Sequence, residues 1–231
     1  MRILFLGDLH GNMVAARALE NVIHEISPDD IWFLGDAVGK GPQSDETCDW
    51  VREHCRHFIG GNWDYGIADK AFPADEYFWN QLGPERMQWL SALPSEAELM
   101  LSGIRFRLFH GRPVTGLLQS DSDKDLLEAV FHTERGDFGG AIFADSHRPF
   151  FRTLSSGYLI NTGSVGNSMG IPNAHAVLLE CTPGEEKKPL FCTVICVPYD
   201  NEAAADIARR DPGLPRKEAY IREVLTGIYS R

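Results

Sequence analysis

The feature that most constrains the fold is an apolar run near the start of the chain that stops abruptly at a polar cluster. Residues 3–6 are Ile, Leu, Phe and Leu, and residues 7–12 read Gly-Asp-Leu-His-Gly-Asn. A short unbroken apolar run is typical of a strand buried on both faces. Asp8 and His10 follow its carboxyl end, which is where ligands bind in open α/β sheets. A carboxylate and an imidazole two residues apart can reach one ion from one loop.

The same pattern occurs twice more in the first quarter of the chain. A second predicted strand over residues 30–34 leads into Gly35-Asp36, and a third over residues 56–59 leads into residues 60–64, Gly-Gly-Asn-Trp-Asp. Helical spacing of apolar residues predicts a helix after each of the first two runs. The order strand, helix, strand, helix, strand predicts a sheet whose polar loops share one edge.

The remaining elements follow from spacing and from turn residues. The helices between the first strands are expected over 14–26, with Asn12 as the cap, and over 44–54. Further along the chain, the sequence predicts a helix over 84–90, a hairpin of 98–101 and 104–109, a helix over 124–132, a strand over 141–144, a hairpin around 155–157, strands over 174–180 and 190–197, and a C-terminal helix broken by Pro212 and Pro215. The last two strands are expected to form a second, antiparallel layer.

Composition and charge narrow the class of protein. The length of 231 residues suits a single domain, 1–231, with residues 66–95 and 112–138 as cap or lid segments over the core. The net charge of −11 disfavours binding to nucleic-acid polymers, which depends on Lys and Arg. No apolar run approaches the roughly 20 residues of a membrane helix, and the N-terminus does not read as a signal peptide.

Cysteine usage and aromatic content add two expectations. The chain has five cysteines, an odd number, and they lack the paired spacing of a metal site. Reduced thiols in a cytoplasm are the simplest account. The aromatic residues of 72–89 favour a cap that packs on the core or a contact within a homo-oligomer over a lid that stacks on substrate.

Seven Asp, His and Asn side chains each follow a predicted strand. They are Asp8, His10, Asp36, Asn62, His110, Asp145 and His147. Carboxylates and imidazoles together suit first-row metal ions, with Mn favoured and Fe, Zn or Ni as other candidates, and Mg is a further candidate. Seven ligands are too many for one such ion and suit two divalent ions that share a bridge, the arrangement used for attack on phosphorus. Asp36 lies on the central loop and is the natural bridge.

The order and spacing of these residues resemble the calcineurin-like metallophosphoesterases, in particular their small bacterial YfcE-like branch. The matching blocks are Gly-Asp-Leu-His-Gly-Asn at 7–12, Gly-Asp and Gly-Pro at 35–42, Gly-Asn-x-Asp at 61–64, His-Gly at 110–111 and Asn-x-Gly-Ser-Val at 161–165. The resemblance implies an α/β fold of the metallophosphatase type, a two-layer mixed β-sandwich flanked by helices (α/β/β/α). It also implies a dinuclear metal site that hydrolyses phosphoesters.

Roles for individual residues come from the same resemblance. It implies that Asp8, His10 and His147 hold the first metal, that Asp36 bridges the pair, and that Asn62, His110 and Asp145 hold the second. A hydroxide that bridges the two ions would be the nucleophile, because both cations lower its pKa. Asp36, Asn62 and Asp64 would be the catalytic residues, with Asp64 in a supporting role. Trp63, Gly163 and Ser164 are candidates for contact with the substrate, the last two through a loop that could equally be a tight turn.

Two positions depart from the family pattern. The family usually has Gly-His-x-His where this chain has Ala144-Asp145-Ser146-His147, so a shorter, charged ligand replaces a histidine. Many members also have a histidine that assists the leaving group at the position of Trp63. These departures leave two classes of function open. The first is a metal-dependent phosphoesterase, with phosphodiesters favoured over phosphomonoesters, phosphoproteins or dinucleoside polyphosphates. The second is a non-catalytic, metal-stabilised binding protein.

Overall fold

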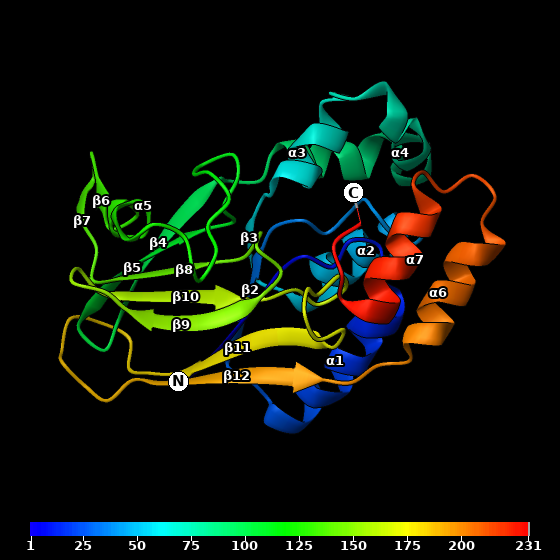
Figure 1. The fold of residues 1–231 in the computed structure, drawn as a ribbon. Coiled ribbons are helices and arrows are strands. Elements are labelled where there is room, and N and C mark those ends of the chain that lie inside the picture. Colours follow the sequence, from blue (N-terminus) through cyan, green and yellow to red (C-terminus); the bar gives the residue numbers. More distant parts are fainter. Residues whose placement is uncertain (231) are drawn as a thin grey trace.

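Two five-stranded mixed β-sheets pack face to face in the computed structural model, which describes residues 1–230 (Figure 1). Sheet A contains, in spatial order, β12 (Phe191–Val197), β11 (Ala174–Glu180), β1 (Arg2–Leu6), β2 (Asp30–Leu34) and β3 (His57–Ile59). Sheet B contains β4 (Glu96–Leu101), β5 (Ile104–Phe109), β8 (Gly140–Phe143), β10 (Tyr158–Thr162) and β9 (Pro149–Thr153). This arrangement confirms the two-layer mixed sandwich implied by the resemblance.

Strand β1 lies at the centre of sheet A and is buried on both faces. Leu4 and Leu6 contribute to the core under the helices, whereas Ile3 and Phe5 contribute to the core between the two sheets. This alternation follows from the two-residue period of a strand. β1 pairs with β2 in parallel and with β11 in antiparallel orientation. The apolar run therefore forms a central strand, as its sequence predicted.

The prediction that the last two strands form the second layer was wrong. β11 and β12 do not form the second layer but extend sheet A, because β11 pairs with the free edge of β1 from Arg2↔Glu180 to Phe5↔Val177. The second layer is sheet B, built by the chain between β4 and β10. An apolar strand sequence shows that a strand is buried but does not show which sheet edge it joins.

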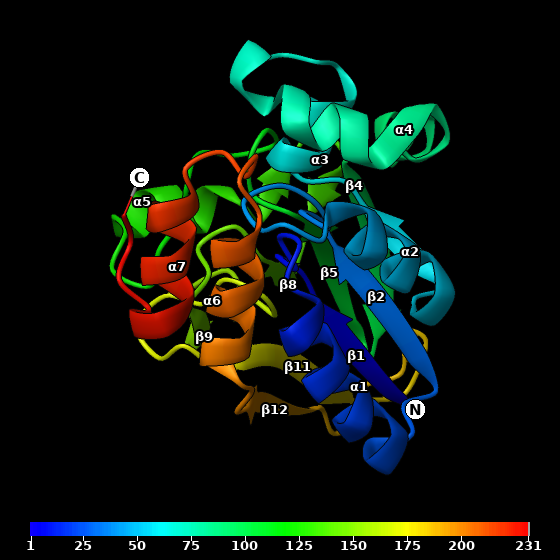
Figure 2. The ribbon, with the colours of Figure 1, turned by 90° about the vertical axis from the view of Figure 1, so that its right-hand side faces the viewer.

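Helices cover the outer face of sheet A (Figure 2). They are α1 (Met13–Ile26), α2 (Ser44–His54), α6 (Asn201–Arg210) and α7 (Lys217–Thr226). The side chain of Asn12 accepts a hydrogen bond from the backbone N–H of Ala15, as expected for the cap of α1. The segment with Pro212 and Pro215 separates α6 from α7, so the expected break in the C-terminal helix is confirmed.

The outer face of sheet B is covered by residues 112–138. This segment contains α5 (Lys124–Ala129) and a small hairpin of β6 (His132–Thr133) and β7 (Gly136–Asp137). Leu127 and Phe131 pack there against Phe109 and Phe143 of the sheet. The helix is shorter than expected because the chain turns into β6 at His132.

Above the end of sheet A lie α3 (Asn62–Ala68), a 3-10 turn (η1, Pro73–Asp75) and α4 (Glu76–Ser91) (Figures 1 and 2). The predicted helix over 84–90 is the second half of α4, which kinks at Gly83 (φ 70°) directly before Pro84. Helix α3 was expected as a loop. Its first residue, Asn62, follows the strand so closely that the glycine pair at 60–61 is the whole connection.

Two findings concern the expectations drawn from composition. All five cysteines are free thiols in the structure. Among residues 1–230, no helix combines the length and the apolar character that a membrane crossing requires.

Candidate metal centre

The carboxyl ends of parallel strands bring the predicted ligands together from both sheets. Strands β1, β2 and β3 run parallel in sheet A, and β5 and β8 run parallel in sheet B. Asp8 and His10 follow β1, Asp36 follows β2, His110 follows β5, and Asp145 and His147 follow β8. Because the two sheets are packed face to face, these loops meet at one end of the sandwich.

Left-handed backbone aims most of these side chains at a common point. Asp8, His10, Asp36, Asp145 and His147 all have φ between 47° and 65°. Such values are uncommon for residues other than glycine and cost about 1–3 kcal/mol each, so they persist only where the surroundings hold them. Backbone strain of this kind clusters at functional sites. Five of the seven predicted ligands carry it here.

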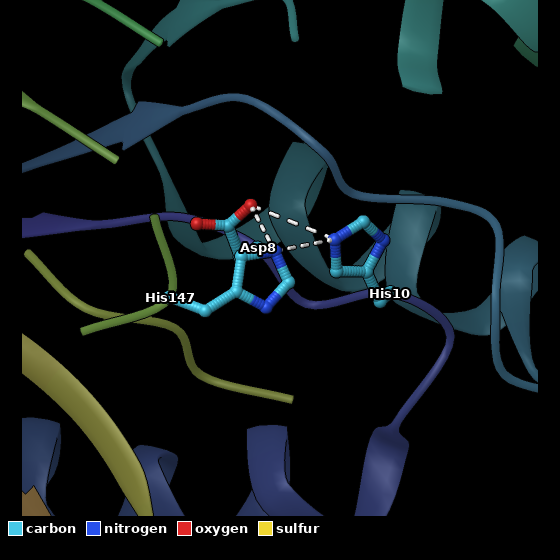
Figure 3. Close-up of side chains that lie close together, drawn as sticks. All are labelled: Asp8, His10 and His147. Atoms are coloured by element: carbon cyan, nitrogen blue, oxygen red, sulfur yellow. Dashed lines mark hydrogen bonds and ion pairs between the residues drawn. The ribbon is translucent and has the colours of Figure 1, made fainter. Parts of the chain in front are cut away.

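The first group consists of Asp8, His10 and His147 (Figure 3). The Oδ1 atom of Asp8 lies 3.5 Å from Nε2 of His10 and 3.3 Å from Nε2 of His147. The two Nε2 atoms are 3.2 Å apart, and all three residues are buried. The structure thus brings together the three residues that the resemblance assigned to the first metal.

The second group consists of Asp8, Asp36 and His110. The Oδ2 atom of Asp36 lies 3.3 Å from Nε2 of His110 and 3.5 Å from Nε2 of His10. Oδ1 of Asp8 lies 3.8 Å from Nε2 of His110. Asp36 therefore stands between a histidine of each group, as a bridging ligand must, and Asp8 also reaches both groups.

The outer hydrogen bonds of the three histidines fix which nitrogen faces the centre. The Nδ1 atoms of His10, His110 and His147 lie 3.1, 2.6 and 2.5 Å from the backbone carbonyls of Val38, Leu34 and Asn167, respectively. A carbonyl oxygen only accepts, so Nδ1 carries the proton and donates it. In the neutral ring the lone pair of Nε2 then points into the site, the arrangement typical of histidines that bind metals.

Buried atoms without partners show that the donor set suits a cation. Oδ1 of Asp8, Oδ1 of Asn62 and Nε2 of His110 are buried and make no hydrogen bond, and they are half of the six such side-chain atoms in residues 1–230. Buried polar atoms left unpaired are costly. Two facing Nε2 lone pairs would also repel each other. A divalent ion removes both penalties, so the residues present fit the metal ions expected for the family.

Glycines permit this close packing. At Gly35 (φ 97°), a Cβ atom would lie 2.6 Å from Nδ1 of His110. At Gly61, a Cβ atom would lie 2.2 Å from Oδ1 of Asp36. Any larger residue at either position would displace a ligand.

Charges within the site shift the pKa values of its members. Burial alone would raise the pKa of Asp8, but His147 and the other imidazoles outweigh it and hold this pKa well below the usual range. Burial would lower the pKa of His110, but Asp36 and the other carboxylates raise it well above its ordinary value. Burial and the charge of Lys40 lower the pKa of His10 to about 3. The site is thus a buried cluster of strongly coupled charges.

Asp145 is engaged differently from the other predicted ligands. Its Oδ1 atom lies 3.8 Å from Nε2 of His110, but the carboxylate belongs to neither of the two groups. Both of its oxygens accept hydrogen bonds from Arg112, and its backbone N–H donates to Oδ2 of Asp8. The role of Asp145 as a ligand of the second metal stays a prediction.

Three residues at the start of α3, Asn62, Trp63 and Asp64, make different contacts near the site. Asn62 has a buried Oδ1 atom that makes no hydrogen bond, and the residue lines the first of the two grooves described below. Asp64 is fully buried and accepts hydrogen bonds from the backbone N–H groups of Asp36, Ala37 and Gly61, so its contacts are those of a residue that positions the Asp36 loop. Burial and the charge of Asp36 raise the pKa of Asp64 to about 7. The ring of Trp63 stands edge-on to that of His10, with centroids 5.8 Å apart.

Gly163 and Ser164 lie behind the β1 loop rather than at an open surface. The hydroxyl of Ser164 donates to the carbonyl of Asp8 and accepts from the backbone N–H of Asn167. Gly163 (φ 71°) packs on His175, and both predicted residues are buried. The hydrogen bond of Ser164 positions Asp8, and contact of Gly163 and Ser164 with substrate stays a prediction.

Sequence reasoning missed two basic residues at the site. Lys40 is buried, with Nζ 2.8 Å from Oδ1 of Asn167 and 3.4 Å from Nε2 of His147. Arg112 holds Asp145 and has a half-exposed side chain. Each stands inside or beside a matching block, after Gly39 and after Gly111, and a cation next to a ligand motif could have been noticed.

Lys40 and Arg112 both line two grooves that meet at the site. The first groove, of about 470 Å³, is also lined by Asn62, Trp63 and Phe72. The second, of about 330 Å³, is also lined by Asp145, His147 and Arg148. The predicted ligands Asn62, Asp145 and His147 therefore each line one of two grooves that share Lys40 and Arg112.

Comparison with known proteins gives the family. A family model described as calcineurin-like phosphoesterase matches residues 1–178. Uncharacterized protein MJ0912 of Methanocaldococcus jannaschii is 27% identical over 228 residues, which cover 87% of this chain and 89% of that protein. The crystal structure of a metallophosphoesterase from Sphaerobacter thermophilus is 25% identical with a TM-score of 0.79, covering 99% of this chain and 100% of that one.

The fold is also that of YfcE, a phosphoesterase from E. coli, whose structure has a TM-score of 0.51 at 16% identity and covers 86% of this chain and 100% of that one. The likeness to YfcE is one of fold. The family model spans more than half of the chain, and it includes every predicted ligand from Asp8 to His147. The chain belongs to the calcineurin-like phosphoesterases.

Proposed function

We propose that the protein hydrolyses phosphodiesters with the help of divalent metal ions. The observation that carries this proposal is a pair of grooves that share Lys40 and Arg112, one lined also by the predicted ligand Asn62 and the other by Asp145 and His147. A phosphate held at the junction could extend one substituent along each groove. A diester has two such substituents, whereas a monoester has one and would use a single groove.

The residues that would hold the ions are the two groups described above. Asp8, His10 and His147 would hold the first ion, Asp36 and His110 would contribute to the second, and Asp36 would bridge them. Asn62 offers the second site an amide oxygen. When bound, the ions would lower the pKa of a coordinated water and stabilise charge on the phosphate. Mixed imidazole and carboxylate ligands suit Mn²⁺, which we expect to support activity.

The chain's own cations would bind and orient the phosphate. Lys40 and Arg112 are the two positive side chains in the wall at the junction, in a protein with a net charge of −11. A guanidinium binds two phosphate oxygens at once, and an ammonium acts as a compact point charge. Asp64 would keep Asp36 in place through its three backbone contacts.

A comparison of two aryl esters tests the proposal. Full-length protein with Mn²⁺ should cleave bis(4-nitrophenyl) phosphate with a higher kcat/KM than 4-nitrophenyl phosphate. Asp36→Asn should lower this activity by about 100-fold or more, since removal of groups that merely orient metal ligands already costs about 10–100-fold. Unfolding curves must show that the variant keeps its fold.

Each other outcome would overturn a defined part of the proposal. Faster cleavage of the monoester would favour a phosphomonoesterase or phosphoprotein phosphatase. Absence of Mn²⁺-dependent cleavage of either ester, despite bound metal, would favour the non-catalytic binding protein. Activity retained by Asp36→Asn would refute the bridging role of Asp36.

A further inference from the structure

The contact between Arg112 and Asp145 has consequences for the second metal. Nη2 of Arg112 lies 2.5 Å from Oδ1 of Asp145, Nε lies 2.9 Å from Oδ2 and 3.1 Å from Oδ1, and the backbone N–H donates to Oδ2 at 3.0 Å. The carboxylate is buried, with 2% of the side chain exposed, whereas 46% of the Arg112 side chain is exposed. This is a charge-assisted pair in which Asp145 is buried and Arg112 is half-exposed.

Such a pair leaves Asp145 poorly available to a metal. A carboxylate offers about four lone-pair sites on its two oxygens. Arg112 makes two contacts with each oxygen of Asp145. A divalent ion that took Asp145 as a ligand would have to displace some of these donors and would also face the charge of the guanidinium.

The first metal group meets this pair only through the backbone of Asp145, whose N–H donates to Oδ2 of Asp8, and not through the guanidinium. Among residues 1–230, Asp8, His10 and His147 make no hydrogen bond or ion pair with the guanidinium of Arg112. His110, of the second group, lies 3.8 Å from the same Asp145 oxygen that receives Nη2. An effect of Arg112 on metal binding should therefore fall on the second ion.

We propose that the guanidinium of Arg112 and the second divalent ion compete for Asp145, so that Arg112 sets the affinity of the second site. The inference rests on the proposed metal-dependent function. It makes Arg112 a positioning residue for Asp145 at low metal concentration. The protein then carries one tightly bound ion and takes up the second only at higher concentration.

Titration with Mn²⁺ on the full-length protein, freed of metal by a chelator, tests the competition. Calorimetry gives the two dissociation constants, and electron paramagnetic resonance detects the spin-coupled pair. Arg112→Met removes the guanidinium but keeps an apolar stem, and the second ion should bind about tenfold tighter or more, as expected for loss of a nearby unit charge. The first dissociation constant should change by less than about threefold.

Arg148→Met is the matched control. Arg148 lines the same groove as Arg112 and is exposed, but it makes no side-chain contact with Asp145 in the described residues. Its substitution changes the net charge equally, so the second ion should bind as in the wild type. An equal increase in the affinity for the second ion in both variants would mean that only the net charge near the site matters, and it would overturn the inference.

Arg112→Lys keeps the inference falsifiable if Arg112→Met does not fold. Lysine retains the charge but cannot form the bidentate contact, so the second ion should bind tighter than in the wild type by a smaller factor, about threefold. A second dissociation constant unchanged in whichever of the two variants folds would overturn the inference alone. A wild-type protein that binds no Mn²⁺ would overturn both the inference and the proposed function.

Discussion

At the scale of single residues, the predicted ligands of the site can be recognised in the sequence, whereas some of the contacts that these ligands make cannot. Asp36 was predicted to bridge two ions, and its Oδ2 atom lies 3.5 Å from Nε2 of His10 and 3.3 Å from Nε2 of His110, while the bridging role itself stays a prediction. The ion pair between Arg112 and Asp145 was not predicted, because the two residues are 33 positions apart and lie after different strands. The sequence suggests which side chains bind metal, whereas ion pairs between distant loops emerge only from their packing.

Trp63 bears on how the leaving group departs. Protonation by a general acid is worth typically about 10²–10⁴-fold, and an indole N–H cannot supply it at neutral pH. We therefore expect rates across a series of aryl phosphodiesters to fall steeply as the pKa of the leaving group rises. Trp63→His should flatten this dependence if the new ring reaches the leaving oxygen. Equal slopes in both proteins, with alkyl esters cleaved well, would show that the proton comes from elsewhere.

His175 links folding to pH. The residue is buried, its Nδ1 lies 2.9 Å from Oγ of Ser168, and burial lowers its pKa. Below a pH of about 6.5, the unfolded chain protonates this ring before the folded one does, so the contribution of His175 to stability falls as the pH falls through this range. It is fully present above that pH.

Denaturation by urea at several pH values measures this contribution. The difference in free energy of unfolding between the wild type and His175→Asn should shrink between pH 7 and pH 5, since asparagine keeps a polar partner for Ser168 but does not titrate there. A difference that is constant over this range would mean that His175 keeps its ordinary pKa in the folded protein.

At the scale of elements, the early strands were predictable and the edges of the sheets were not. The runs that became β1 and β2 are buried on both faces, and their periodicity and terminating glycines gave their bounds closely. β11 and β12 were assigned to the wrong layer because pairing is decided by which edge is free. Helix α3 was missed because its seven residues contain an aromatic pair and a glycine that suggest a loop.

The segment from α3 to η1 forms one wall of the first groove, and its exposed aromatic residue offers a test. Phe72 lines this groove and is 63% exposed. If one substituent of the diester lies along this wall, Phe72→Ala should raise KM for an aryl diester about fivefold, as expected for loss of one aromatic contact, and should leave kcat nearly unchanged.

Phe191→Ala provides the comparison for this change. Phe191 is 60% exposed on β12, outside both grooves that carry the proposed function. Its substitution should leave both kinetic constants as in the wild type. Identical KM values for wild type and Phe72→Ala would place the substituent elsewhere.

At the scale of the whole molecule, loops from two sheets supply one site. Sheet A provides the loops of Asp8 and Asp36, and sheet B provides those of His110 and Asp145. The resemblance to a family predicted this convergence, since spacing along the chain cannot show how two sheets face each other. Left-handed backbone at five ligands lay beyond prediction from residue type, because Asp and His only tolerate that conformation and do not require it.

The most direct test of the central claim is the anomalous scattering of crystals soaked in excess Mn²⁺. We expect two peaks within about 4 Å of each other, the first touching Asp8, His10 and His147 and both touching Asp36. Excess metal is required because Arg112 is expected to weaken the second site. A map with no peak at these residues, or with Asp36 bound to neither ion, would contradict the account.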